Sequence, residues 1–113
     1  MKTSSSTWKQ FAKNAPLFAA LGDDTRLSLL LQLGEANLAS ITQLSEGRPQ
    51  TRQAIRKHLQ ILEDACLVKG VRRGRENLFQ VNPKTMAAAS QSLAAISRQW
   101  DDALARLKSF VEE

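Results

Sequence analysis

The fold of this chain is decided by residues 51–66, which read TRQAIRKHLQILEDAC. At about 100° per residue, four apolar side chains of this segment lie on one face of a helix, each within about 40° of the first of them. These four are Ile55, Leu59, Leu62 and Cys66. The opposite face is polar, and over its first two turns it carries no acidic group. The segment therefore predicts a helix, capped by Thr51, that buries one face and presents a basic face.

A second, shorter helix is expected just before this one. The run from Ser40 to Gln43 matches a capping box, in which the first side chain and the fourth satisfy each other's backbone N–H groups. Gly47 ends this helix and Pro49 prevents its continuation. Two helices joined by a tight turn are typical of a helix-turn-helix, here at about residues 40–66.

Further towards the N-terminus, residues 8–21 favour helix, and Pro16 is expected to break them into two short pieces. Asp23 is expected to cap a further helix, because its carboxylate can accept from the first free N–H groups. That helix is expected to stop at Gly34, a residue type common just after a helix end.

Beyond residue 66 the hydrophobic period changes from that of a helix to that of strands. Val68–Arg72 and Glu76–Val81 predict a two-stranded hairpin, at about residues 68–81, that must lean on the helices to be stable. Asn82 and Pro83 then provide a cap and a first helical residue. A long helix follows at about residues 84–112. The expected fold is mainly α: a winged helix-turn-helix in one domain, residues 1–113.

The charge of the chain points to a polyanionic partner. Its net charge is +5, and all of this excess lies in the segment 48–83. The segments on either side are balanced, with four basic and four acidic residues each. A basic segment between two neutral ones is the footprint expected where a protein meets nucleic acid.

The side chains of this basic segment are those that DNA readout uses. Arg forks onto guanine, Gln onto adenine, and Lys binds phosphate or guanine. We expect Arg56, Gln53 and Arg52 to read bases, and Lys57 and the hairpin arginines mainly to hold phosphates. The predicted DNA-binding residues are Gln50, Thr51, Arg52, Gln53, Arg56 and Lys57, with Arg72, Arg73 and Arg75 of the hairpin.

Three blocks of this sequence resemble the arsenical-resistance repressor (ArsR) family of winged-helix regulators. They are Leu21-Gly-Asp-Asp-Thr-Arg-Leu27, the segment 51–68, and Gly74-Arg-Glu76 with Phe79. The resemblance implies a homodimer, a recognition helix in the major groove of DNA, a wing on the flanking DNA, and repression relieved by an effector. Many relatives carry Gly where this chain has Cys66, so the end of the helix is expected to turn differently.

No metal, cofactor or catalytic site is expected. Metal-sensing relatives carry a cysteine pair in the helix that corresponds to residues 40–47 here, or Asp and His ligands in the last helix, whereas this chain has one Cys and one His. His58 is expected to be partly buried and bonded to a backbone or phosphate oxygen. Cys66 is expected to act as a small apolar residue in the buried stripe. No effector is indicated.

The last helix carries an apolar stripe that suits a partner helix. Its side chains recur at spacings of three and four over nearly four heptads. We expect it to form a dimer seam, although part of it also packs on Trp8, Phe11, Phe18 and the helix expected between Asp23 and Gly34. The predicted dimer-interface residues are Met86, Leu93, Ile96, Trp100, Leu104 and Leu107.

These features together predict a cytoplasmic, sequence-specific regulator of transcription that binds double-stranded DNA as a homodimer, with repression favoured. A single cysteine fits a reducing compartment, and no apolar run is long enough to span a bilayer. The alternative is a winged-helix module that binds another protein and has lost sequence reading. An enzyme is not expected, because no nucleophile–base set or paired carboxylate stands out.

Overall fold

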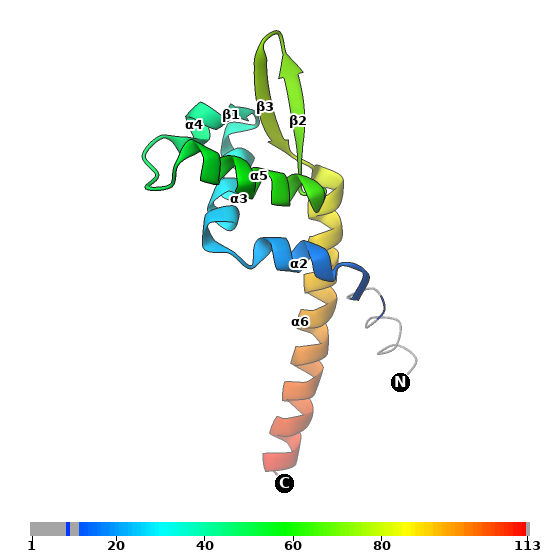
Figure 1. Ribbon diagram of the computed structural model, residues 1–113. Helices are drawn as coiled ribbons and strands as arrows, with labels where there is room; N and C mark the ends of the chain where they lie inside the picture. Colours follow the sequence, from blue (N-terminus) through cyan, green and yellow to red (C-terminus); the bar gives the residue numbers. More distant parts are fainter. Residues whose placement is uncertain (1–8, 10–11, 113) are drawn as a thin grey trace.

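The computed structural model describes residues 9 and 12–112 of the chain. Its helices surround the base of a small sheet, and the longest helix runs away from this body to the C-terminus (Figure 1). The elements are α2 (Ala15–Leu21), α3 (Asp24–Ala36), β1 (Ala39–Ser40), α4 (Ile41–Ser45), α5 (Arg52–Asp64), β2 (Val68–Arg73), β3 (Glu76–Val81) and α6 (Pro83–Glu112). The predicted winged helix-turn-helix is confirmed.

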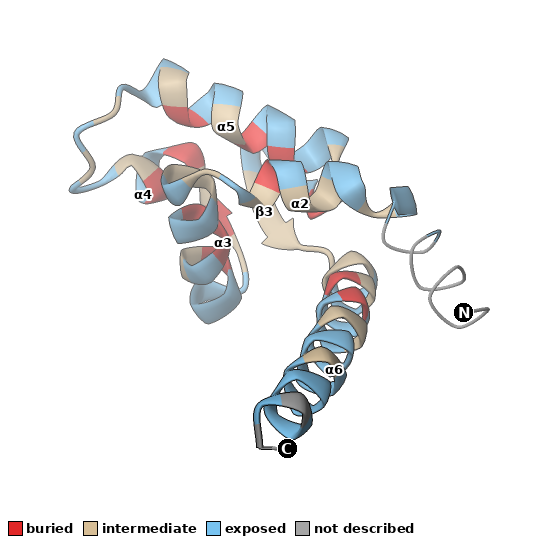
Figure 2. Cartoon of the chain, turned by 90° about the horizontal axis from the view of Figure 1, so that it is seen from below, coloured by how far each residue is buried: buried red, intermediate tan, exposed pale blue. Residues whose placement is uncertain are grey.

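The core lies where α3, α4, α5 and the sheet meet (Figure 2). From α5 it takes Ile55, Leu59 and Leu62, which are all at most 1% exposed. Three of the four residues of the predicted stripe are therefore buried as expected. Full burial of one such side chain stabilises the fold by about 1.5–3 kcal/mol, so the stripe holds α5 firmly in one rotation about its axis.

The helix starts follow the capping residues that the sequence indicated. Asp23 accepts a hydrogen bond from the backbone N–H of Arg26, and Thr51 accepts one from that of Ala54, each at 3.0 Å. Ser40 and Gln43 form a complete capping box at the start of α4. Four free N–H groups at each helix start must find acceptors, which is why these short polar side chains fix the helix boundaries.

Of two expectations about the first helices, one is confirmed and one is wrong. The break at Pro16 is present, since residues 12 and 13 are helical, Asn14 forms a turn, and Pro16 lies in the first turn of α2, a position that tolerates proline; residues 8, 10 and 11 of the expected first piece lie outside the described residues. Gly34 does not end α3, which continues to Ala36. The helix stops instead at Asn37, which adopts φ = 68°. Asn tolerates this left-handed conformation, and its backbone N–H still bonds to the Leu33 carbonyl.

The sheet has three strands rather than the two expected. The predicted hairpin is present, and its tip is formed by Gly74 and Arg75. The short strand β1 pairs with β3 in addition, placing Ala39 opposite Phe79 and Ser40 opposite Leu78. A strand of this length has no periodicity to read in a sequence. The pairing of β1 matters because Ser40, which lies opposite Leu78 of β3, is also the residue that caps α4. The pairing therefore joins the wing to the start of α4.

Cys66 is not buried, contrary to expectation. α5 ends at Asp64, and Cys66 then adopts φ = 61°, which turns its side chain into solvent. The next residue, Leu67, is fully buried in the core instead. The left-handed conformation favours glycine, so a Cys at this position carries strain.

Within the described ranges, 9 and 12–112, no helix combines the length and the hydropathy needed to cross a membrane.

Replacing Cys66 with Gly is expected to raise the free energy of unfolding by about 1 kcal/mol, because glycine adopts φ = 61° without steric cost. Cys66→Ala is the control, since alanine keeps the Cβ and should leave stability nearly unchanged. Urea unfolding of the three proteins measures this. Equal stability of the Gly and Ala variants would contradict the assigned strain.

Candidate nucleic-acid interface

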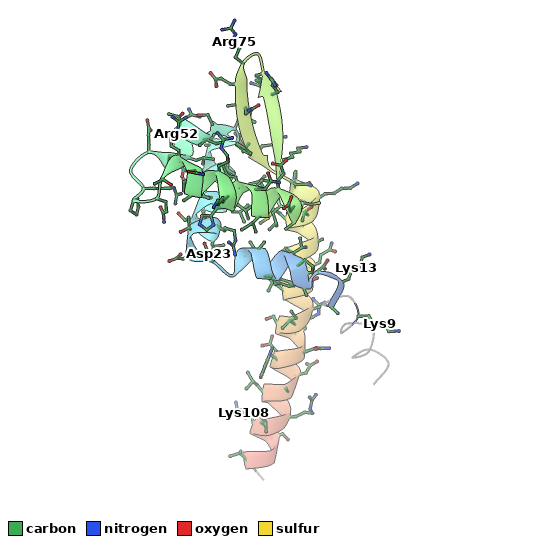
Figure 3. All side chains as sticks on the ribbon, in the orientation of Figure 1. Lys9, Lys13, Asp23, Arg52, Arg75 and Lys108 are labelled. Carbon is green, nitrogen blue, oxygen red and sulfur yellow. The ribbon has the colours of Figure 1, made fainter. Side chains whose placement is uncertain are left out.

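The basic face of α5 and the tip of the wing are exposed. On α5 the side chains of Gln53, Arg56 and Lys57 lie away from the buried stripe, Arg52 lies at the flank of this face near the start of the helix, and all four residues are exposed. Arg75 projects from the tip of the hairpin, which points away from the free end of α6, and Arg52 lies near the start of α5 (Figure 3). The fold thus presents two groups of cations on separate elements.

Most of these cationic side chains are not bonded to other groups of the protein. Among the residues that the structure describes, the side chains of Arg56, Lys57, Arg73 and Arg75 make no hydrogen bond or ion pair. Arg72 donates only a long bond, 3.4 Å from its Nε to the Gly74 carbonyl oxygen. Unpaired guanidinium groups are available to bind phosphate or guanine.

Arg52 differs from the other basic residues because it is already held. Its Nη2 donates to the Thr42 Oγ1 of α4 at 2.7 Å, across the turn of the helix-turn-helix. The bond fixes the direction of the guanidinium before any ligand binds. Thr42 was not anticipated from the sequence, since nothing in the local pattern indicates which residue of α4 faces Arg52.

Two other residues of the basic segment turn inward. Gln50 donates from Nε2 to the Thr25 hydroxyl at 3.0 Å, and its Oε1 is buried without a partner. Gln50 therefore reaches DNA only if this bond opens. Arg48 donates to the Leu44 carbonyl and to the Gln32 side chain, both at 2.8 Å, so it stabilises the turn between α4 and α5.

A small polar cluster anchors the inner side of α5. His58 Nδ1 lies 3.8 Å from the Asp23 carboxylate and 3.4 Å from Arg26 Nη1, so its partners are side chains rather than the backbone or phosphate oxygen expected. Arg26 also donates from Nε to the Ala20 carbonyl at 2.6 Å. The cluster ties α5 to the junction of α2 and α3. The Arg26 backbone N–H, which donates to the Asp23 carboxylate, holds the pKa of that carboxyl below its usual value.

A hollow of about 370 Å³ separates α5 from the wing. Its lining includes Arg56 and Glu63 of α5, Gly70 and Arg72 of β2, and Asn77 and Phe79 of β3. The strand register explains this set, because Gly70 pairs with Phe79 and Arg72 with Asn77, and cross-strand partners share a face of the sheet. Gly70, Asn77 and Phe79 were not predicted as functional. The predicted hairpin could have indicated them, because its turn position sets which residues of the two strands lie opposite each other.

Metal binding has no support in the described part of the chain, where no group of three or more His, Cys, Asp or Glu side chains lies close enough to hold an ion.

Comparison with known proteins identifies the family. No family model matches the chain. The chain is 37% identical to an ArsR-like transcriptional regulator from Rhodococcus sp. RHA1, with a TM-score of 0.72, and the match covers 88% of this chain and 93% of that one. It is 40% identical over 72 residues to YuzN, a helix-turn-helix-type transcriptional regulator of Bacillus subtilis; this covers 58% of this chain and 78% of YuzN. A solved structure of the antimony-specific transcriptional repressor AntR matches at 25% identity with a TM-score of 0.58, covering 80% of this chain and 82% of AntR.

This chain belongs to the ArsR family. It is accordingly a transcriptional regulator that binds DNA. Within this ArsR-family fold α5 is the second helix of the helix-turn-helix, and the β2–β3 hairpin is the wing. The free cations described above thus lie on the two elements that the family resemblance assigned to DNA.

In this ArsR-family protein the Asp23 carboxylate should make a pH-dependent contribution to stability. Its pKa is lowered in the fold, so the contribution is complete above the unfolded value of about 3.9 and is lost as the pH falls through the folded value. Asp23→Asn keeps a capping side chain but removes the charge. The stability difference between the two proteins, followed by urea unfolding, should be constant near neutral pH and shrink below about pH 4. A difference that grows on acidification would contradict this.

Proposed function

We propose that this protein is a homodimeric repressor that binds an inverted-repeat operator in double-stranded DNA. The observation that carries the proposal is the set of exposed, unpaired cations on α5 and the wing. In this proposal α5 enters the major groove and the wing contacts the neighbouring DNA. Family membership supports DNA binding, and the side chains support the assignment of roles.

Base reading is proposed for the first two turns of α5. Arg56 and Gln53 are exposed there, and burial of the opposite face fixes their direction. Arg52 is held by Thr42, so less side-chain entropy is lost when it binds. A guanidinium that forks onto the N7 and O6 of guanine discriminates against other bases by about 1–3 kcal/mol.

Phosphate binding is proposed for Lys57 and for the wing. Arg73 and Arg75 stand next to each other around the hairpin tip, where like charges repel in the absence of a ligand. Phosphate oxygens relieve this repulsion. Such contacts release counterions and contribute affinity that depends on salt but carry no base preference.

Dimerisation is proposed for the distal part of α6. Leu93, Trp100, Leu104 and Leu107 are 52–65% exposed in the single chain, and Ile96 is half-buried beside them. Apolar side chains that recur at helical spacing favour a second copy of the same helix. Met86 is different, since it packs partly against the core of its own chain. A two-fold dimer matches half-sites one helical turn apart.

Repression, rather than activation, is proposed because AntR, with the same fold, is a repressor. The antimony specificity in the name of AntR is not carried over, since residues 9 and 12–112 of this chain offer no cluster of metal ligands.

Two substitutions separate base reading from phosphate binding. Arg56→Ala should weaken binding to the operator by about 1–3 kcal/mol per base that the side chain reads, and change little on scrambled DNA. Arg73→Ala should weaken both DNAs similarly and flatten the slope of log affinity against log salt by about one unit for each phosphate left unneutralised. The operator is first obtained by selection from a random duplex pool, and anisotropy titrations over a salt series then give the affinities.

Glu35→Gln on α3, an exposed position outside α5 and the wing, is the control and should bind like wild type. If Arg56→Ala weakens operator and scrambled DNA equally, α5 does not read bases. If the pool yields no preferred sequence at all, the protein-interaction module is the better description.

Leu104→Glu should shift the protein from dimer to monomer at tens of micromolar, because a charge in an apolar seam must be desolvated. The matched control is Leu31→Glu on α3, where the leucine is 65% exposed but lies outside the proposed seam. Sedimentation velocity distinguishes the two states. A Leu104→Glu protein that sediments like wild type would exclude this seam.

A further inference from the structure

A second hollow, of about 370 Å³, lies between α2 and the C-terminal half of α5 and shares no lining residue with the hollow at the wing (Figure 1). Small side chains keep it open, since Ala19 and Ala20 of α2 reach no further than Cβ. Ile61 of α5 lies in it and is 42% exposed. The lining residues are Pro16, Ala19, Ala20, Arg26, Ile61, Asp64 and Ala65. A mainly apolar hollow of this size with a few polar groups is typical of a site for a small molecule.

The two charged residues of this lining, Arg26 and Asp64, have opposite signs, yet among the described residues they form no ion pair with each other. The Arg26 side chain is anchored through Nε, which donates to the Ala20 carbonyl at 2.6 Å. Its Nη atoms are held more loosely, because Nη1 lies 3.4 Å from His58 Nδ1 and Nη2 lies 3.5 Å from the Ala19 carbonyl oxygen. A guanidinium has five N–H donors, so the outer ones can bind an external carboxylate.

The carboxylate of Asp64 has similar spare capacity. Its Oδ1 accepts a hydrogen bond from Gln60 Nε2 at 2.9 Å, and an ionised carboxylate can accept several more. Asp64 is also the last residue of α5, where the helix dipole favours a cation. An external ammonium group therefore finds a favourable position at this end of the hollow.

The two charges lie at opposite ends of the hollow. Arg26 contacts His58, and Asp64 follows His58 on α5 by six residues, which is a rise of about 9 Å along the helix axis. Ile61 is midway between His58 and Asp64 on the same helix. The hollow thus presents a cation, an apolar middle and an anion in that order.

We propose that this hollow binds a small zwitterion whose carboxylate and ammonium groups are separated by an apolar chain. The carboxylate binds Arg26, the ammonium group binds Asp64, and the chain packs on Ile61 and the alanines of α2. A carboxylate without an amine leaves Asp64 unmatched, and an amine without a carboxylate leaves Arg26 unmatched. A purely apolar molecule leaves both charges partly desolvated and unpaired, which costs free energy.

The site also has a route to α5, and this part of the proposal rests on the proposed function. The contact between Arg26 and His58 is one of those that tie α5 to the junction of α2 and α3. A bound carboxylate competes with His58 for the Nη1 of Arg26. Occupancy therefore loosens α5 on the side away from the wing and lowers the affinity for the operator.

The first test compares ligands that differ by one charge. Titration calorimetry of the wild-type protein uses ε-aminocaproate as the zwitterion, with caproate and hexylamine as its singly charged analogues. The zwitterion should bind with a Kd of about 1 mM or tighter, and each analogue about three-fold or more weakly than it. The shorter γ-aminobutyrate should also bind more weakly, because it does not reach both ends. Equal affinity for the zwitterion and both analogues, or no binding of the zwitterion, would overturn the site.

The second test changes the anionic end of the hollow. Asp64→Asn should weaken binding of ε-aminocaproate by about three-fold and leave caproate binding no weaker, because caproate has no ammonium group. The control is Glu63→Gln, which removes the adjacent exposed carboxylate of α5 that does not line this hollow. A loss of affinity that is the same for both ligands would show that Asp64 does not bind the ammonium group.

The third test fills the hollow from α2. Ala19→Leu should abolish measurable binding of ε-aminocaproate, whereas Ala15→Leu, at another exposed position of α2 outside the lining, should bind it like wild type. Both alanines are exposed, so thermal unfolding should show that both variants are folded. Unchanged binding by a folded Ala19→Leu protein would place the ligand elsewhere and overturn the proposal.

The DNA arm separates this proposal from the proposed function. Saturating ε-aminocaproate should weaken operator binding by about five-fold or more, and caproate at the same concentration should have a smaller effect. If the zwitterion binds the hollow but operator affinity does not change, the route to α5 is wrong. If no operator emerges from the random pool, the proposed function fails, while the three calorimetric tests still decide whether the site exists.

Discussion

The architecture depends on the burial of one face of α5. Ile55, Leu59 and Leu62 insert into the core, and helical geometry then fixes where every other residue of α5 points. Rotation by a single residue would replace Ile55 with Arg56 at the centre of the core. A buried, unpaired cation costs far more than an isoleucine contributes, so the basic face has one possible orientation. The same burial thus supplies stability and fixes the direction of the side chains that we propose to contact DNA.

Two contacts fix the position of the wing relative to this core. Val68, at the start of β2, is buried next to Leu67, and β1 pairs with β3 while leading directly into the cap of α4. The hairpin is therefore attached to both helices of the helix-turn-helix. Because the base of the wing is fixed relative to α5, the spacing between them is preset, and a hollow of defined lining can exist there.

α6 serves two purposes along its length. Near its start Ala89 and Ser92 are buried, and the Ser92 hydroxyl accepts a hydrogen bond from Asn14 Nδ2 at 2.6 Å. Further along, apolar side chains such as Trp100 and Leu104 are more than half exposed (Figure 2). An unbroken periodic stripe in the sequence thus divides into a part that stabilises the monomer and an exposed part, for which we propose a partner helix.

The sequence by itself determined the elements that follow from local physics: the buried stripe of α5, the capping residues Asp23, Ser40 and Thr51, and the hairpin around Gly74. Each depends on spacing or on hydrogen bonds between near neighbours, so a short window contains the information. The residues at which α3 and α5 end were predicted wrongly. Asn37 and Cys66 adopt left-handed backbone conformations, which their residue types alone do not predict. Only the tertiary structure decided the pairing of β1, the Arg52–Thr42 bond, the proximity of His58 to Asp23 and the hollow at Gly70. These join residues distant in the chain, and their distances are set by how the elements pack.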